Sequence, residues 1–278
     1  MSAGVARVRG HVEPALTDNG TQPPLDARRV ISLEGGRNFR DLGGYRTLDG
    51  RRVKWGMLFR SGSMAWLTPA DYERLSTLAI KTICDLRTVQ ERTAEPNKWR
   101  EVANIGYWAR EHSDSFGELR KVLVSGLSTP ARARAAMLEG YRHLPFEQAP
   151  AHRELFVRLA AGEIPLAFNC AAGKDRAGTA AALILSALGV PRDTVIEDYV
   201  LTDRVVDLAK IFMDRKRESE LTGLAPGVVT AVLKADASYL RAALDAVDER
   251  HGSVAAYLRD ALGITEEALL AIRQNLLE

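Results

Sequence analysis

Residues 165–189 constrain the fold of this chain more than any other stretch, and they read PLAFNCAAGKDRAGTAAALILSALG. The apolar residues 166–168 predict a short buried strand, the small residues 171–173 predict a turn, and residues 179–188 predict a helix. Backbone N–H groups in such a turn attract an anion, and so does the positive end of the helix that follows. The segment therefore predicts an anion-binding loop at the end of a strand.

Two side chains in this loop indicate its chemistry. Cys170 follows the strand directly, where a positive field favours a nucleophilic thiolate. Arg176 lies six residues later, and its planar guanidinium matches two oxygens of a phosphate. The other cysteine, Cys84, has Gln90 at that spacing. A thiolate beneath a phosphate-shaped loop indicates transfer of a phosphoryl group to Cys170.

The sequence CAAGKDRAG resembles the signature loop of the cysteine-dependent protein tyrosine phosphatases, most closely their bacterial branch of dual- and triple-specificity enzymes. Residues 37–62, 80–92 (IKTICDLRTVQER) and 239–265 are similar to other blocks of that branch. Two positions depart from the family pattern. Asn169 stands where the family usually has His, and Ala177 stands where it usually has Thr or Ser. Both adjoin the nucleophile, so they bear on the reaction rate.

The resemblance implies a protein tyrosine phosphatase-like fold and an enzyme that hydrolyses phosphomonoesters through a phosphocysteine intermediate, without a cofactor. Phosphotyrosine proteins are the first expected substrates, with phosphoinositides and phosphoserine or phosphothreonine proteins after them. Two other classes stay open. One is a sulfurtransferase or arsenate reductase-like enzyme, which also uses a thiolate in an anion loop. The other is a phosphate-binding module without activity.

Two aspartates could donate the proton that the leaving oxygen needs. Asp175 lies within the loop, where a carboxylate beside a phosphate is unfavourable unless it serves as an acid. Asp85 ends the predicted strand 80–86, so it could project into the same crevice. Asp85 could instead pair with Arg87 or cap a turn. We expect Asp175 to be the acid, with Asp85 as the alternative or a helper, and the resemblance also points to Asp175.

The residues between Cys170 and Arg176 are expected to bind phosphate, and they are Ala171, Ala172, Gly173 and Lys174. We place Lys174 on the rim of the loop, where its flexible charge would contact a second phosphate or simply remain solvated. Cys84 is expected to be a core strand residue, with a redox role towards Cys170 as the alternative.

Strands alternate with helices up to residue 189, which predicts an α/β fold with a largely parallel central sheet flanked by helices. Ligands of such sheets bind beyond the carboxyl ends of the strands, where Cys170 falls. Residues 29–278 are expected to form one domain, with a helical part from 190 to 278. Residues 1–28 are expected to form a loose arm. We predict helical structure at 113–145 as a possible lid. The basic region 110–134 could be a lid, a contact for an acidic surface or a solvated helix face.

The composition limits the classes of partner that we expect this chain to bind. With 38 basic and 36 acidic residues, the net charge is only +2, which argues against a nucleic-acid-binding protein. The five histidines show no metal-ligand spacing. The longest apolar run is too short to span a bilayer, and the N-terminus lacks the apolar stretch of a signal peptide. We expect a cytoplasmic protein, with secretion by a signal-less route as the alternative.

Overall fold

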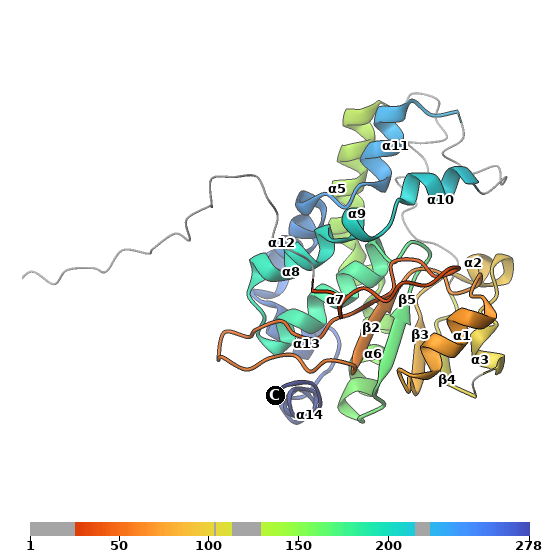
Figure 1. The fold of residues 1–278 in the computed structure, drawn as a ribbon. Helices are drawn as coiled ribbons and strands as arrows, with labels where there is room; N and C mark the ends of the chain where they lie inside the picture. Colours follow the sequence, from red (N-terminus) through yellow and green to blue (C-terminus); the bar gives the residue numbers. More distant parts are fainter. Residues whose placement is uncertain (1–25, 103, 113–128, 215–222) are drawn as a thin grey trace, which may run out of the picture.

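The computed structural model describes residues 26–102, 104–112, 129–214 and 223–278 (Figure 1). Within them the sheet has the strand order β1–β2–β5–β3–β4. The strands are β1 (Arg40–Asp41), β2 (Leu58–Ser61), β3 (Thr82–Asp85), β4 (Gly106–Ala109) and β5 (Leu166–Asn169). β2, β5, β3 and β4 run parallel, and β1 is antiparallel to β2. The predicted α/β fold with a largely parallel sheet is confirmed.

Helices surround this sheet, and most of their ends follow sequence signals. Thr68, Thr129 and Thr265 cap helices with their hydroxyls, as such residues commonly do. The helices are α1 (Pro69–Ser76), α2 (Val89–Ala94), α3 (Trp99–Val102), α5 (Pro130–Glu147), α6 (Ala149–Ala160), α7 (Asp175–Leu188), α8 (Arg192–Val200), α9 (Thr202–Val205), α10 (Leu208–Asp214), α11 (Pro226–Leu233), α12 (Ala237–His251), α13 (Val254–Asp260) and α14 (Glu266–Leu276).

Alternate strand residues face two separate apolar layers. Leu166 and Phe168 of β5 belong to the larger core, which α5, α6, α7, α8 and α12 complete. Ala167 faces the smaller core beneath α1 and α3, where Trp99 is buried. Figure 1 accordingly shows α1 and α3 on one side of the sheet and the long helices on the other. Because helices cover both faces of the sheet, the strand sequences contain short apolar runs rather than alternating polar and apolar residues.

The carboxyl ends of the parallel strands meet at one edge of the sheet. Ser61 of β2 and Asp85 of β3 both lie opposite Asn169 of β5. Cys170 therefore emerges between the ends of two neighbouring strands. This is the edge where parallel sheets bind ligands.

Strand β2 begins only at Leu58, because residues 52–54 pair with the last residues of the chain. One boundary differs from expectation. Helix α7 begins at Asp175, within the predicted loop. Residues 113–128 of the predicted lid lie outside the described residues, and residues 130–145 belong to α5, which packs against α11 and α12.

The predicted N-terminal arm falls almost wholly on residues 1–25, which also lie outside the described part. In the described part, no helix combines the length and the apolar character needed to cross a bilayer.

Candidate active site

The loop after β5 is fastened to the end of β2. The backbone N–H of Cys170 donates to the carbonyl of Ser61 at 3.3 Å, and the N–H of Ser63 donates to the carbonyl of Ala171 at 2.9 Å. Gly173 has φ +71°, and a Cβ atom on it would lie 2.6 Å from the backbone nitrogen of Gly62. A glycine is therefore required at this point of the loop.

Side chains hold the rest of the loop by its carbonyl groups. Asn38 Nδ2 lies 3.0 Å from the carbonyl oxygen of Gly173 and 3.5 Å from that of Ala172. Arg60 Nη2 donates to the carbonyl of Gly173 at 2.8 Å and lies 3.5 Å from that of Lys174. Both side chains are buried. All four carbonyl groups from 171 to 174 thus face protein donors.

This arrangement leaves the loop N–H groups available. In a planar trans peptide the carbonyl and the following N–H point in opposite directions. The N–H groups of residues 172–175 therefore point away from the scaffold. In the part of the chain that the structure describes, none of these N–H groups has a protein acceptor. Buried N–H groups rarely remain unpaired, so this concave side is suited to an anion.

A buried ion network fixes the two arginines beneath the loop. Asp198 of α8 accepts from Arg60 Nη1 at 2.5 Å and from Arg40 Nε at 3.4 Å, and Tyr45 donates to it at 2.9 Å. Burial alone would raise the pKa of Asp198, but the two arginines outweigh it and the pKa is lowered. Arg40 and Arg60 are thus scaffold residues. Asp198 lies more than 130 residues from both in the sequence, and no local pattern marks it as their partner.

Arg176 is held in one orientation by a glutamate that the sequence reasoning missed. Its Nη1 and Nη2 lie 2.6 Å from the two carboxylate oxygens of Glu91, and Nη1 also donates to the carbonyl of Leu86 at 3.1 Å. Glu91 occupies the third position of α2, where it also accepts from the N–H of Thr88. The available signal was the Thr88–Glu91 capping pattern, which predicts a helix start but not an arginine partner.

Charge stabilises both members of this pair. Burial would raise the pKa of Glu91. The charge of Arg176 and the hydrogen bonds from Arg176 and Thr88 outweigh burial and lower this pKa to about 2. Burial would lower the pKa of Arg176, but Glu91 raises it above its ordinary value. The pair is therefore ionised at neutral pH. Three of the five N–H donors of Arg176 are occupied, which leaves Nε–H and the outer Nη2–H on one edge.

Asp85 lies beside the loop but is enclosed. It is 0% exposed, and it accepts from Nε and Nη2 of Arg87, from the hydroxyl of Tyr107 at 2.9 Å and from Asn169 Nδ2 at 3.1 Å. Pairing with Arg87 was the alternative that the sequence left open. Asn169, which stands in the family's usual histidine position, directly precedes Cys170 and so links this cluster to the loop.

Asp175 is the more open of the two candidate acids. As the first residue of α7, it accepts from the hydroxyl of Tyr141 at 2.6 Å, and its side chain is 20% exposed. Lys174 Nζ lies 3.3 Å from the same oxygen, Oδ1.

Lys174 is not the rim residue that the sequence suggested. Its side chain is 2% exposed, and its ammonium donates to the carbonyls of Val232 at 2.5 Å and Lys234 at 3.3 Å. These carbonyls terminate α11, and the end of a helix attracts a cation. Lys174 therefore joins the loop to α11.

The two cysteines differ in their surroundings. Cys84 lies in the large core as expected, and burial raises the pKa of its thiol to about 12. Cys170 is 1% exposed and begins the loop that leads to the N-terminus of α7. No hydroxyl in the described residues is hydrogen-bonded to its sulfur, and the buried Oγ1 of Thr179 has no partner. Ala177 offers none.

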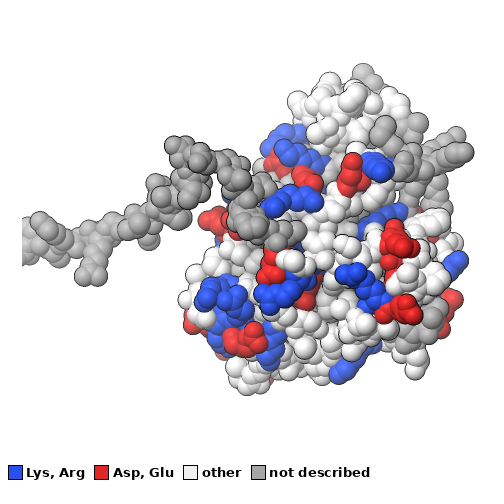
Figure 2. Space-filling model, in the orientation of Figure 1, with Lys and Arg blue, Asp and Glu red and all other residues white. Residues whose placement is uncertain are grey.

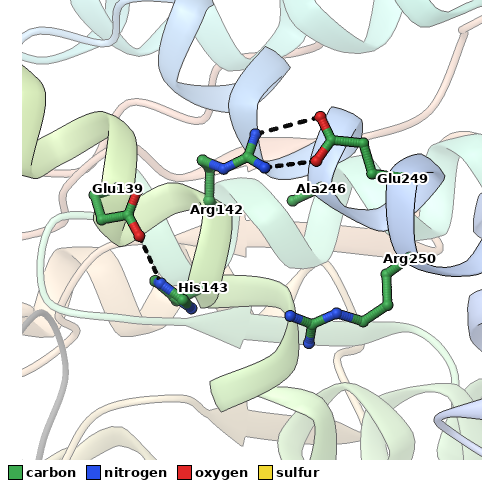
Figure 3. A pocket seen from close by; sticks show the side chains of 6 residues that line it. All are labelled: Glu139, Arg142, His143, Ala246, Glu249 and Arg250. Atoms are coloured by element: carbon green, nitrogen blue, oxygen red, sulfur yellow. Dashed lines mark hydrogen bonds and ion pairs between the residues drawn. The ribbon is translucent and has the colours of Figure 1, made fainter.

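The described surface carries charges of both signs and a pocket away from the loop. Figure 2 shows basic and acidic residues interspersed over the face in view. A pocket between α5 and α12 contains none of the predicted site residues (Figure 3). Its Arg142 is paired with Glu249 at 2.5 Å, and His143 with Glu139 at 2.8 Å. Carboxylates thus already pair with Arg142 and His143 in this pocket.

Comparison with known proteins agrees with this geometry. A family model described as the tyrosine phosphatase family matches residues 31–278. A protein of Cupriavidus necator whose name assigns it to the tyrosine-protein phosphatases is 37% identical over 242 residues, which are 86% of each chain. The triple specificity protein phosphatase PtpB of Mycobacterium tuberculosis is 32% identical over 283 residues, covering 89% of this chain and 99% of that protein. The chain therefore belongs to the tyrosine phosphatase family, as its loop sequence suggested.

Proposed function

We propose that this protein tyrosine phosphatase hydrolyses phosphomonoesters through a phosphocysteine formed on Cys170. The arrangement of the loop and Arg176 supports this proposal most directly. Four backbone N–H groups and the free edge of Arg176 are unoccupied by protein acceptors in the described residues. That edge presents two parallel N–H groups, the pattern that binds two oxygens of a phosphate. Cys170 stands at the start of the same loop.

In the first step, the thiolate of Cys170 attacks phosphorus opposite the ester oxygen. The new S–P bond forms as the P–O bond to the leaving group breaks. The loop N–H groups and Arg176 bind the three remaining oxygens, where charge is concentrated in the transition state. Asp175 donates its proton to the departing oxygen, which leaves as an alcohol or phenol.

In the second step, a water molecule attacks phosphorus. Asp175, now a carboxylate, accepts a proton from that water, and the electrons of the S–P bond return to Cys170 as a thiolate. Inorganic phosphate leaves, and the enzyme regains its starting state. We assign Asp175 this role rather than Asp85, because the enclosed Asp85 already accepts from three side chains.

Family membership implies phosphorylated substrates, and we propose phosphotyrosine proteins as the first class. Phosphoinositides and phosphoserine or phosphothreonine proteins are second candidates, since the similar PtpB is named for triple specificity. For Lys174 to bind a second phosphate, it must leave the carbonyls of Val232 and Lys234. Substrates with adjacent phosphates would then compete with the end of α11.

The test is turnover of p-nitrophenyl phosphate and of a phosphotyrosine peptide, with and without EDTA, by the wild type and Cys170→Ser. We expect activity that EDTA does not change, and none in the variant. The variant should still bind vanadate, because loop and arginine are intact. Turnover by Cys170→Ser would contradict the mechanism. Phosphate binding by a wild type that hydrolyses neither substrate would instead support a binding module.

A further inference from the structure

Two buried tyrosines lie behind the proposed acid, Asp175. The hydroxyl of Tyr141 in α5 is 2.6 Å from Asp175 Oδ1, and the hydroxyl of Tyr199 in α8 is 2.6 Å from that of Tyr141. Both tyrosines are 0% exposed, and their rings meet edge to face at 6.0 Å between centroids. Helix α5 thus supplies a hydroxyl to the first residue of α7, and α8 supplies a second hydroxyl to the first hydroxyl.

The direction of these hydrogen bonds follows from counting hydrogens. Each phenol has one, and an ionised carboxylate can only accept. Tyr141 therefore donates to Asp175, and Tyr199 donates to Tyr141. Burial, followed by the charge of Asp175, raises the pKa of each tyrosine well above 10, so both hydroxyls keep their hydrogens.

The close approach of Tyr199 depends on a small residue in α7. A Cβ atom on Gly178 would lie 2.9 Å from the ring of Tyr199. The ring of Tyr141 also packs against the ring of Tyr239 of α12, with 5.5 Å between ring centroids. Phenylalanine rings would fill the same space without leaving hydroxyls to be paired. The hydroxyl chain therefore serves Asp175 rather than the packing.

The other oxygen of Asp175 is differently placed. Oδ1 contacts the hydroxyl of Tyr141 and the ammonium of Lys174, whereas Oδ2 has no partner in the described residues. The titratable and charged groups that face Asp175 are Tyr141, Tyr199, Tyr239, Lys174 and Arg176. One oxygen is thus anchored, and the other is free to carry a proton.

We propose that Tyr141 and Tyr199 are positioning residues that direct Oδ2 of Asp175 toward the leaving oxygen. The inference rests on the proposed role of Asp175 as general acid. As the Oδ2 proton passes to the leaving oxygen, negative charge develops on the carboxylate. The hydrogen bond from Tyr141 to Oδ1 strengthens with that charge. The chain therefore stabilises Asp175 most when the proton has left.

Substrates with different leaving groups test this role. A tyrosine leaving group, with a pKa of about 10, needs the acid more than the more acidic nitrophenol does. Tyr141→Phe should lower kcat/KM, which reports the step that releases the leaving group, about tenfold on a phosphotyrosine peptide and less than about threefold on p-nitrophenyl phosphate. Tyr199→Phe should have the same pattern with a smaller loss, because Tyr141 still reaches Asp175. The basic limb of the kcat/KM profile should move to higher pH in Tyr141→Phe.

Tyr257→Phe is the matched control. Tyr257 is also buried, but its hydroxyl donates to the carbonyl of Pro145 at 2.7 Å. We expect this variant to lower kcat/KM on neither substrate. Equal losses on both substrates in Tyr141→Phe and Tyr257→Phe would reduce Tyr141 to a packing residue and overturn the proposal.

A double variant completes the test. If Tyr141 acts through Asp175, adding Tyr141→Phe to Asp175→Asn should cause little further loss. Losses that multiply would overturn the proposal. The mechanism itself is judged separately. Turnover by Cys170→Ser would refute the phosphocysteine, whereas an inactive Cys170→Ser with an unaffected Tyr141→Phe would refute only the tyrosine chain.

Discussion

Two acidic clusters lie at the same edge of the sheet, and they are built for different purposes. Around Asp85, the carboxylate is fully buried and accepts from Arg87, Tyr107 and Asn169. Around Asp175, one oxygen is anchored by Tyr141 while the side chain remains 20% exposed. A carboxylate whose acceptor sites are filled braces the fold. One with a free oxygen can exchange a proton with a ligand.

The largest expected effect separates the two clusters directly. Asp175→Asn should lower kcat on a phosphotyrosine peptide about 10²–10⁴-fold with little change in Tm, because it removes the proton donor. Asp85→Asn should lower the free energy of unfolding by about 3–5 kcal/mol, because the buried charge of Arg87 loses its partner. Kinetics and urea unfolding of both variants give the comparison. A stable but inactive Asp85→Asn would reverse the assignment.

The next effect concerns the loop between the clusters. Ala177 cannot donate a hydrogen bond to the leaving thiolate, and the hydroxyl of Thr179 does not reach it. We therefore expect breakdown of phosphocysteine to limit turnover. A hydrogen bond to a charged group contributes about 1.5–3 kcal/mol, or about tenfold to a hundredfold in this step. Stopped-flow assays with p-nitrophenyl phosphate should show a burst, which Ala177→Thr shrinks while raising the steady-state rate.

Thr179→Val is the control for that experiment. The Oγ1 atom of Thr179 is buried without a partner, so its removal should leave the burst unchanged. A wild type without a burst, together with an Ala177→Thr variant of unchanged rate, would show that the alanine does not slow the reaction.

A smaller effect concerns Lys174 on the Asp175 side of the loop. Lys174→Ala should lower activity on phosphoinositides about threefold to tenfold more than on phosphotyrosine peptides, because only the former offer a second phosphate. Lys234→Ala removes an exposed charge close by and should not change this ratio. Equal losses on both substrates would mean that Lys174 only fastens the loop to α11.

The smallest effect is on acid stability, beside the Asp85 cluster. The pKa of Glu91 is about 2 in the folded protein against 4.5 ordinarily. The stability that this shift confers is complete above pH 4.5 and is lost as the pH falls toward 2. Because Glu91 is 32% exposed, we expect only about 1 kcal/mol. Glu91→Gln should make unfolding less dependent on pH in this range, and an unchanged dependence would contradict the shift.

Sequence reasoning succeeded where the signal is local. The strand before Cys170 and the alternation of strands and helices that predicts a largely parallel sheet follow from neighbouring residues and period. It could not supply the partners of the loop. Glu91 and Tyr141 lie 85 and 34 residues from the groups they bind, and nothing in a single sequence pairs them. Lys174 was misplaced for the same reason, because the end of α11 is 58 residues away.

Trapping the intermediate tests most directly whether the phosphoryl group is transferred to Cys170. The Asp175→Asn variant should accumulate it, since p-nitrophenol leaves with little acid assistance while the water step lacks its base. After rapid quenching of a reaction with substrate labelled at phosphorus, peptide mapping locates the label. We predict label on the peptide that contains Cys170, and none when Cys170 is also changed to Ser. Turnover with label on another residue, or with label persisting in the Cys170→Ser variant, would contradict the account.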